Sequence, residues 1–226
     1  MAKGRQLDGS VVAVIGATGG LGSAICSTLE SRGARIVGVN RSGSTSDRSI
    51  DLVVDVRDAG AGEEIVSTAV DRHGRLDGIV IASGIVAFGD VADTDDITVE
   101  ELFLTNSMAP LWIARHAAEA LTDSKGFFVN ISGVVASTPM PGMAAYSASK
   151  AAAAAGLDAL QREWRRRKVQ VIDAQPPHTE TGLATRPLAG TAPDMPEGVT
   201  PAAVATRIVT AVEDGERGTL SADSFG

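Results

Sequence analysis

Residues 14–22 read VIGATGGLG and join an apolar run, VVAVIG at 11–16, to a helical pattern that begins at residue 20. Glycines at this junction let the backbone turn tightly, let a pyrophosphate approach the amides and let the helix pack on the strand. The phosphate would lie at the positive end of that helix, where unpaired N–H groups point at it. The G-x-x-x-G-x-G spacing therefore predicts a dinucleotide site made by Gly16, Thr18, Gly19, Gly20, Leu21 and Gly22.

The rest of the chain repeats this alternation of short apolar runs and helical patterns. Further strands are predicted at 34–39, 51–56, 77–83, 126–132 and 169–174, with a seventh at 218–223, and helices at 20–32, 61–73, 98–121, 144–167 and 201–213. The strands are nearly continuous in hydrophobicity, as strands covered on both faces are. The pattern predicts an α/β fold, a Rossmann-type, doubly wound parallel sheet of about seven strands in a single domain, 1–226.

Composition narrows the class of protein. The 226 residues are 44% hydrophobic and only 4% aromatic, with 25 glycines, which suits one sheet-and-helix domain. A net charge of −8 argues against a nucleic-acid surface. One cysteine, Cys26, excludes an intrachain disulfide and favours a reducing compartment. No signal peptide core and no apolar run of about 18–20 residues is present, so we expect a cytoplasmic protein with no membrane partner.

A second stretch, AAYSASKAAAAAG at 144–156, holds the one tyrosine of the chain. Tyr146 and Lys150 lie four residues apart and share one face of a predicted helix. A nearby ammonium lowers the pKa of a phenol from its usual value near 10, which prepares it to give or take a proton. Ser132 ends the fifth strand, where its hydroxyl would stabilise negative charge on a substrate oxygen. Each residue alone has an ordinary structural role, but together with the glycine turn they predict catalysis.

These motifs, in this order, resemble the short-chain dehydrogenase/reductase family of one-domain, NAD(P)-dependent oxidoreductases. The resemblance covers nearly the whole chain and includes GRLDGIVIASG at 74–84 and PPHTET at 176–181. It implies that Asn106, Ser132, Tyr146 and Lys150 are catalytic, with Lys150 on the nicotinamide ribose and Asn106 ordering a water that relays protons. It further implies cofactor contacts from Asp55, Val56, Ala82, Ser83, Gly84, Tyr146, Lys150, Pro176 and Thr179. The reaction would interconvert a carbonyl and a secondary alcohol.

The sequence also departs from the family pattern. Ile15 replaces a threonine before the first glycine, and Ile81-Ala82-Ser83-Gly84 replaces Asn-Asn-Ala-Gly. Pro177 replaces a glycine near the nicotinamide site. These changes concern the packing around the cofactor and leave the proton-transfer groups in place.

The end of the second strand bears on the choice of cofactor. An NAD enzyme usually places an acidic residue there for the ribose diol, whereas this chain has Asn40, Arg41 and Ser42. Without that carboxylate a 2′-phosphate is not repelled, and Arg41 offers it a bidentate contact. The sequence favours NADP(H) over NAD(H), although Gly19 stands where many NADP-preferring relatives carry Lys or Arg.

Residues 176–200 form the longest irregular stretch, and we expect 178–200 to be a lid over the ligand crevice, with a disordered loop as the alternative. His178 and Arg186 within it are possible substrate contacts. The predicted pocket is mainly apolar and suits a small-molecule carbonyl or alcohol, leaving a ketoacyl thioester, a steroid-like ketone and a xenobiotic ketone open. Its expected lining is Val86, Phe88, Val134, Val135, Met140, Met143 and Leu183.

The sequence also bears on metal binding, assembly and alternative functions. No His, Cys or carboxylate cluster has metal-ligand spacing, so no metal is predicted. The alanines at 151–156 allow a second helix to approach closely, and the family resemblance implies a homodimer or homotetramer built on this helix. A catalytically idle NADP-binding regulatory protein on the same fold is the alternative function, and a sugar-nucleotide epimerase would need a larger second domain.

Overall fold

The computed structural model describes residues 4–43 and 51–226, so residues 1–3 and 44–50 of the predicted domain lie outside the described residues. The described strands are β1 (Val11–Ile15), β2 (Arg35–Asn40), β3 (Leu52–Val53), β4 (Gly78–Ile81), β5 (Phe127–Ile131), β6 (Gln170–Ala174) and β7 (Gly218–Leu220). The helices are α1 (Gly20–Ser31), α2 (Ala61–His73), α3 (Asp96–Phe103), α4 (Ala109–Ser124), α5 (Ala144–Trp164) and α6 (Pro201–Asp214).

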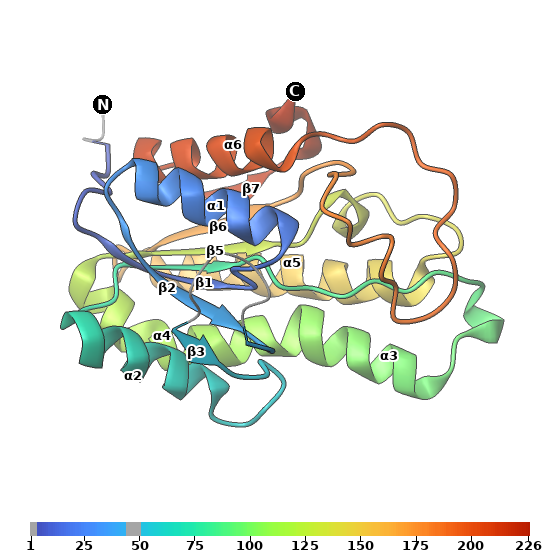
Figure 1. Cartoon of the computed structure of the whole chain (residues 1–226), viewed down its shortest axis with the longest axis horizontal. Helices are drawn as coiled ribbons and strands as arrows, with labels where there is room; N and C mark the ends of the chain where they lie inside the picture. Colours follow the sequence, from blue (N-terminus) through green and yellow to red (C-terminus); the bar gives the residue numbers. More distant parts are fainter. Residues whose placement is uncertain (1–3, 44–50) are drawn as a thin grey trace.

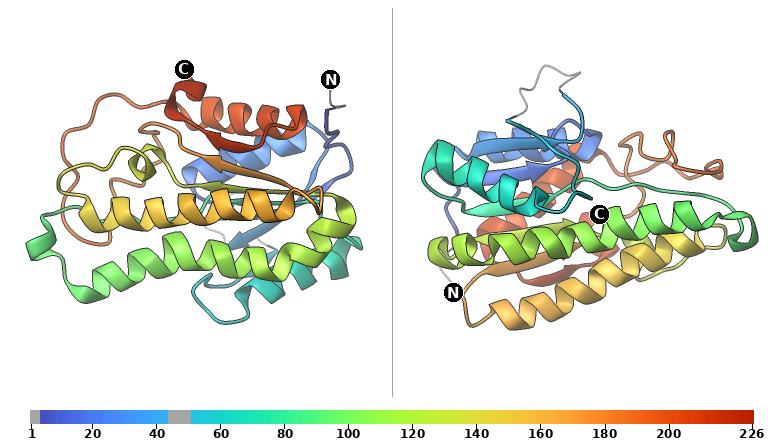
Figure 2. Two further views of the ribbon diagram at one scale, coloured as in Figure 1. Left: turned by 180° about the vertical axis from the view of Figure 1, so that it is seen from behind. Right: turned by 90° about the horizontal axis from the view of Figure 1, so that it is seen from below.

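The described strands form one parallel sheet in the order β3-β2-β1-β4-β5-β6-β7. Helices α1 and α6 cover one face, and α2, α4 and α5 cover the other (Figures 1 and 2). The order reverses between β1 and β4, where the chain leaves the two strands toward opposite faces and a crevice opens at their carboxyl ends. The predicted doubly wound α/β fold is confirmed.

Each face of the sheet has its own apolar core, because successive strand residues point to opposite faces. Ala13 and Ile15 of β1 pack with Ile113 of α4 on one side, while Val12 and Val14 pack with Ile25 of α1 on the other. All five residues of β1 are buried, which explains why its sequence is continuously apolar and not alternating.

The predicted helix 98–121 is the element that differs most from expectation. The structure has α3 and α4 in line, joined by a π-helical turn at Leu104–Met108. Pro110 lacks an N–H, so it cannot donate to the carbonyl of Asn106 four residues earlier, as a regular α-helix requires. Such turns occur often at functional sites, and this one contains Asn106.

Smaller differences concern element ends. β3 is limited to Leu52–Val53, and β7 stops at Leu220 because Ala222–Phe225 form a short 3₁₀ turn. α5 ends at Trp164, so residues 165–168 form a turn beyond the helix. Lys168 in that turn has a φ of 62°, a left-handed conformation that does not continue an α-helix.

The segment 176–200, called the lid segment below, crosses the carboxyl edge of the sheet (Figure 1). Its backbone bonds to the stretch after β4, from Phe88 N to the Ala189 oxygen at 2.9 Å and from Leu188 N to the Val86 oxygen at 2.7 Å. Gly190 has a φ of +73°, and a Cβ there would lie 1.8 Å from the Phe88 oxygen. The lid segment therefore has backbone partners on the stretch after β4.

Candidate active site

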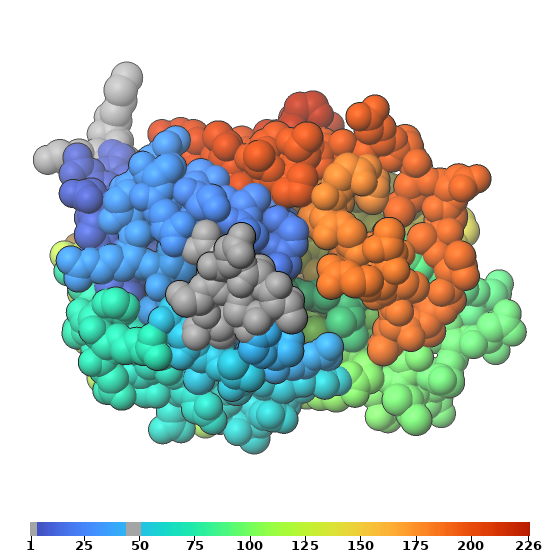
Figure 3. All heavy atoms as spheres, in the orientation of Figure 1, coloured from blue at the N-terminus to red at the C-terminus, as the bar shows by residue number. Residues whose placement is uncertain are grey.

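A cavity of about 610 Å³ lies at the carboxyl ends of the central strands and runs from the glycine turn to the lid segment. Figure 3 shows the surface hollowed between α1, in blue, and the lid segment, in orange. The cavity brings together residues that are far apart in sequence. Its lining includes the predicted Gly16, Thr18, Gly19, Gly20, Leu21, Asn40, Arg41, Ser42, Asp55, Val56, Ala82, Ser83, Gly84, Ser132, Tyr146, Lys150, Pro176 and Thr179.

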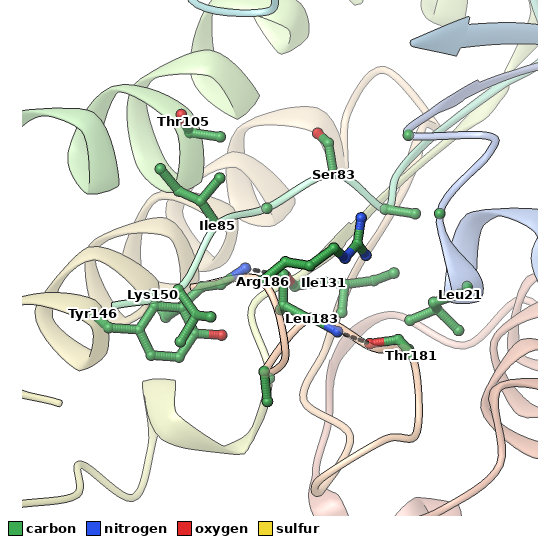
Figure 4. A pocket seen from close by; sticks show the side chains of 18 of the residues that line it. Leu21, Ser83, Ile85, Thr105, Ile131, Tyr146, Lys150, Thr181, Leu183 and Arg186 are labelled. Atoms are coloured by element: carbon green, nitrogen blue, oxygen red, sulfur yellow. Dashed lines mark hydrogen bonds between the residues drawn. The ribbon is translucent and has the colours of Figure 1, made fainter. Parts of the chain in front are cut away.

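Tyr146 and Lys150 project from the same face of α5 into this cavity, and the Tyr146 hydroxyl points toward its centre (Figure 4). Both side chains are largely buried, at 8% and 6% exposure. Lys150 Nζ donates a hydrogen bond to the Ile131 carbonyl oxygen at the end of β5, at 2.9 Å. The helix spacing thus places an ammonium and a phenol beside each other at the edge of the sheet.

Burial changes the proton affinity of both groups in the ligand-free protein. It raises the pKa of Tyr146 to about 12. It lowers the pKa of Lys150 to about 8, against the opposing charge of Asp173. The charged form of each group loses hydration inside the protein, so each shift favours the neutral form. The direction for Tyr146 is opposite to the predicted lowering by Lys150, because desolvation by burial is the cause that acts on the phenol.

Ser132 is fully buried just beyond β5, and its hydroxyl donates to a carboxylate oxygen of Asp173 on β6, with Oγ 2.8 Å from Oδ2. Gln175 Nε2 donates to the same oxygen at 2.8 Å. Sequence reasoning missed Asp173, which lies inside an apolar strand pattern. A carboxylate within a buried strand, VQVIDA, was the available signal, because buried acids without a partner are rare.

Asn106 does not line the cavity and lies directly behind it. Its side chain closes a pair of hydrogen bonds with Ile85, from Ile85 N to Oδ1 at 3.1 Å and from Nδ2 to the Ile85 oxygen at 3.0 Å. A Cβ added at Gly84 would lie 3.3 Å from both Asn106 Oδ1 and Lys150 Nζ. Asn106 therefore fixes the segment after β4 against α5, close to the Lys150 ammonium.

The glycine turn has the shape that an anion site needs. Gly16 has a φ of +84°, and a Cβ there would meet the Ser83 amide nitrogen at 2.9 Å. Gly22 does not line the cavity; a Cβ on it would lie 2.0 Å from the Gly16 oxygen, so its role is close packing of α1 on the turn. No side chain caps the start of α1 at Gly19, so the first N–H groups of this helix are left for a ligand.

Two arginines lie at the far end of the cavity from Tyr146. Arg41 is exposed, and its positive charge contributes to holding the pKa of the Asp55 carboxyl below its usual range. The larger cause is Arg57, whose Nε and Nη2 reach the two Asp55 oxygens at 2.9 and 2.6 Å. Arg57 also pairs with Glu101 of α3. Sequence reasoning missed Arg57 and Glu101 as lining residues, although Arg57 directly follows the predicted Asp55 and Val56.

The apolar half of the cavity agrees with expectation, since all of Val86, Phe88, Val134, Val135, Met140, Met143 and Leu183 line it. His178 and Arg186 of the lid segment line it as well. His178 Nε2 lies 3.3 Å from Glu180 Oε1. Arg186 Nε donates to the Gly182 oxygen at 3.2 Å, and Figure 4 shows the Arg186 guanidinium extending into the cavity between Ser83 and Leu21.

The described part of the chain shows neither a metal site nor a membrane-spanning helix. Within residues 4–43 and 51–226, no group of three or more His, Cys, Asp or Glu side chains is placed to hold a metal ion. No helix in the same part of the chain has the length and apolarity needed to cross a membrane.

Known proteins resemble this chain in sequence. An uncharacterized oxidoreductase of Methylorubrum extorquens is 32% identical over 199 residues, which cover 82% of this chain and 79% of that protein. Versicolorin reductase of Emericella nidulans is 31% identical over 65% of this chain and 60% of its own length. Galactitol 2-dehydrogenase of Cereibacter sphaeroides is 29% identical over 80% and 76%.

Solved structures share the fold at low sequence identity. A short-chain dehydrogenase of Burkholderia cenocepacia in complex with NADP has a TM-score of 0.81 and 23% identity, covering 97% of this chain and 91% of its own. A 3-ketoacyl-(acyl-carrier-protein) reductase of Brucella melitensis complexed with NADH has a TM-score of 0.82 and 18% identity, covering 97% and 100%. The short chain dehydrogenase family profile matches residues 10–189. With the parallel sheet and the glycine turn described above, this match shows that the chain belongs to the short-chain dehydrogenase family and is an oxidoreductase.

Proposed function

We propose that the protein interconverts a carbonyl and a secondary alcohol on a mainly apolar small molecule, using NADP(H). The observation that carries this proposal is the convergence of Tyr146, Lys150 and Ser132 on one cavity that also includes the glycine turn. The apolar residues around Tyr146 favour a substrate without a charged group near the reacting carbon. The lining of the cavity extends from Tyr146 to Asn40 and Arg41. This extent suits a dinucleotide with its nicotinamide near Tyr146 and its adenosine near Arg41.

The residues present suit a nicotinamide dinucleotide. The uncapped start of α1 and the positive φ of Gly16 provide a cradle for a pyrophosphate. When bound, the nicotinamide supplies or accepts the hydride. Tyr146 gives a proton to the substrate oxygen during reduction and takes one during oxidation. Lys150 favours the ionised phenol by its charge, and the carbonyl of Ile131 orients its ammonium.

Ser132 and Asn106 assist this proton transfer in the proposal. Ser132 contacts the substrate oxygen and fixes its position next to the Tyr146 hydroxyl. Asn106 orders a water that connects Lys150 with solvent, which is supported by its place next to Gly84 and the Lys150 ammonium. Pro176 and Thr179 hold the nicotinamide end, and Arg41 with Arg57 offers a 2′-phosphate two guanidinium groups.

The oligomeric state and compartment form part of the same proposal. We propose a cytoplasmic homodimer or homotetramer of single-domain subunits, paired through α4 and α5. Met108 at the end of the π-helical turn and Leu111 on α4 are 41% and 42% exposed, and Ala152 and Ala155 on α5 are exposed as well. Small side chains at such a face let two helices approach closely across a two-fold axis.

The cofactor preference can be tested by binding alone. We expect NADPH to bind more tightly than NADH, and Arg41→Ala to reduce NADPH affinity by about tenfold while leaving NADH affinity unchanged, because a charged hydrogen bond contributes about 1.5–3 kcal/mol. Thermal shift and calorimetric titration measure both. Equal binding of the two cofactors by the unmodified protein would contradict the role of Arg41.

Turnover is tested on a panel of apolar ketones and their alcohols, including acetophenone and 1-phenylethanol, by NADPH absorbance. We expect Tyr146→Phe to reduce kcat by at least a hundredfold, since it removes the general acid, with cofactor affinity kept. Cofactor binding without turnover of any compound in the panel would favour the regulatory alternative. Activity that survives in Tyr146→Phe would exclude the proposed mechanism.

A further inference from the structure

One arginine of the lid segment reaches into the cavity. Arg186 is among the lining residues, and Figure 4 shows its guanidinium extending between Leu21 and Ser83 and away from the Tyr146 ring. Leu21 lies in the first turn of α1, directly after Gly20 of the glycine turn. The guanidinium therefore points to the side of the cavity that the glycine turn forms.

The base of the lid segment lies directly against the glycine turn. A Cβ added at Gly20 would lie 2.8 Å from the Thr181 carbonyl oxygen and 2.9 Å from the Thr181 Cα. The next residue, Gly182, accepts a hydrogen bond at its carbonyl oxygen from Arg186 Nε, at 3.2 Å. Arg186 is thus connected to the start of α1 through two neighbouring residues of the lid segment.

The two terminal nitrogens of Arg186 have no protein acceptor. In the part of the chain that the structure describes, the bond from Nε to Gly182 is the one hydrogen bond of this side chain, and no carboxylate lies within ion-pair distance of it. The two acids that line the same cavity, Asp55 and Glu101, both pair with Arg57. A guanidinium that points into a cavity and has no carboxylate partner suits an anionic ligand.

We propose that Arg186 is a cofactor-binding residue of the lid segment, whose terminal nitrogens bind the pyrophosphate of the dinucleotide. The inference rests on the cofactor site of the proposed function, in which the uncapped start of α1 at Gly19 receives that pyrophosphate. A pyrophosphate has charged oxygens on both phosphorus atoms. Those that the N–H groups of α1 do not engage are acceptors for a planar guanidinium, which binds in a bidentate way.

This contact couples the lid segment to the cofactor. The lid segment also carries Leu183, which packs against the apolar cluster that includes Val86 and Phe88. These three residues line the apolar part of the cavity. A dinucleotide held by both α1 and Arg186 therefore fixes a wall of the part of the cavity that the proposed function gives to the substrate.

Binding of three ligands distinguishes the groups that Arg186 could contact. NADPH, NADH and ADP-ribose all contain the pyrophosphate, whereas only NADPH has the 2′-phosphate and only ADP-ribose lacks the nicotinamide. We expect Arg186→Ala to weaken the binding of all three about tenfold in calorimetric titration, the effect of a charged hydrogen bond. Arg186→Lys keeps the charge without the bidentate geometry and should weaken binding less.

Thr185→Ala is the matched control for the structure of the lid segment. Thr185 Oγ1 donates to the same Gly182 oxygen at 2.9 Å, so this substitution removes a side-chain bond to that carbonyl and keeps the guanidinium. We expect its affinities for the three ligands to stay within about twofold of those of the unmodified protein. An equal loss of affinity in Thr185→Ala and Arg186→Ala would assign the effect to the lid structure and overturn the proposal.

The remaining outcomes separate this inference from the proposed reaction. A loss confined to NADPH would place Arg186 on the 2′-phosphate, and a loss that spares ADP-ribose would place it on the nicotinamide; either result overturns the proposal, as do unchanged affinities. Weaker binding of all three ligands by Arg186→Ala, in a protein that turns over no compound of the panel, would support the pyrophosphate contact and overturn the proposed reaction. An unmodified protein that binds none of the ligands would overturn both.

A second measurement follows the lid segment itself. Saturating NADPH should slow hydrogen–deuterium exchange across residues 181–188 of the unmodified protein, because the bound pyrophosphate holds Arg186. At saturating NADPH, Arg186→Ala should lose most of this protection, whereas Thr185→Ala should keep it. Protection that is the same in Arg186→Ala and in the unmodified protein would show that the lid segment responds to the cofactor without Arg186, and would overturn the proposal.

Discussion

At the scale of single residues, Tyr146 and Lys150 show how burial and function oppose each other. Removal of water shifts the pKa of Tyr146 up to about 12 and that of Lys150 down to about 8. Both shifts favour neutral groups, although the proposed chemistry needs an ammonium beside an ionisable phenol. A bound nicotinamide cation would add positive charge near the phenol and lower the pKa of Tyr146. We therefore infer that cofactor binding completes the acid–base site.

Because Tyr146 is the single tyrosine of the chain, the effect of the cofactor on its pKa can be tested by the ultraviolet absorbance of tyrosinate. In the ligand-free protein we expect no tyrosinate at pH 10, the ordinary pKa of the phenol, because the pKa is raised to about 12. Saturating NADP⁺ should bring ionisation to lower pH, and Lys150→Met should reduce that change. Tyrosinate that forms at the same pH with and without NADP⁺ would contradict the inference.

Lys150 should also make the free energy of unfolding depend on pH. Its pKa is near 8 in the folded protein and 10.5 in the unfolded chain, so between these pH values the unfolded chain binds more protons. The free energy of unfolding then rises with pH, by up to about 3 kcal/mol at about 1.4 kcal/mol per pH unit. Urea unfolding from pH 8 to 10 measures this rise, and Lys150→Met should abolish it. An equal rise in both proteins would assign it to other groups.

Among the secondary-structure elements, the lid segment and the π-helical turn both hold the stretch that follows β4. The lid segment is held by backbone bonds to the 85–89 stretch, and the turn between α3 and α4 places Asn106 where it bonds Ile85. Both therefore act on the same short stretch after β4, which carries Val86 and Phe88 into the cavity. The shape of this part of the cavity depends on that stretch remaining fixed.

Gly190 offers a direct test of the lid contact. A Cβ at Gly190 would lie 1.8 Å from the Phe88 oxygen, so Gly190→Ala must separate the lid segment from the 85–89 stretch. We expect faster hydrogen–deuterium exchange across residues 176–200 and a KM raised severalfold. Gly182→Ala is the matched control, since Gly182 has nearly the same φ, +71°, and its Cβ would meet nothing closer than 3.7 Å. Equal effects of both substitutions would point to backbone strain alone.

At the scale of the whole molecule, the reversal of strand order between β1 and β4 creates the crevice, and the residues beyond β1, β4, β5 and β6 fill its rim. Met108 at the end of the π-helical turn and Leu111 on α4 are exposed large apolar side chains.

The assembly is tested by light scattering with size-exclusion chromatography. Leu111→Glu places a charge on the α4 face and should convert the proposed dimer or tetramer to smaller species, because burying an unpaired charge is costly. Val70→Glu on α2 is the control, since Val70 is similarly exposed at 39%, against 42% for Leu111. A monomeric unmodified protein, or dissociation caused equally by both substitutions, would contradict pairing through α4.

The order of strands and helices, the glycine turn and the pairing of Tyr146 with Lys150 could all be predicted from the amino-acid sequence. Local rules were enough for these features, since buried strands are continuously apolar, tight turns need glycine, and residues four apart share a helix face. The apolar lining residues also followed, because the loops that carry them leave the carboxyl ends of predicted strands.

The contacts between distant segments could not be predicted from the sequence, because they depend on how the folded elements pack. The hydrogen bond from Ser132 to Asp173 joins residues 41 apart, and nothing in either strand indicates which side chain its neighbour will face. The π-helical turn at Asn106, the pairing of Arg57 with Glu101 and the seating of Gly190 on Phe88 depend in the same way on how elements pack. The proton affinities followed packing too, because desolvation depends on everything that surrounds a group and not on its neighbours in sequence.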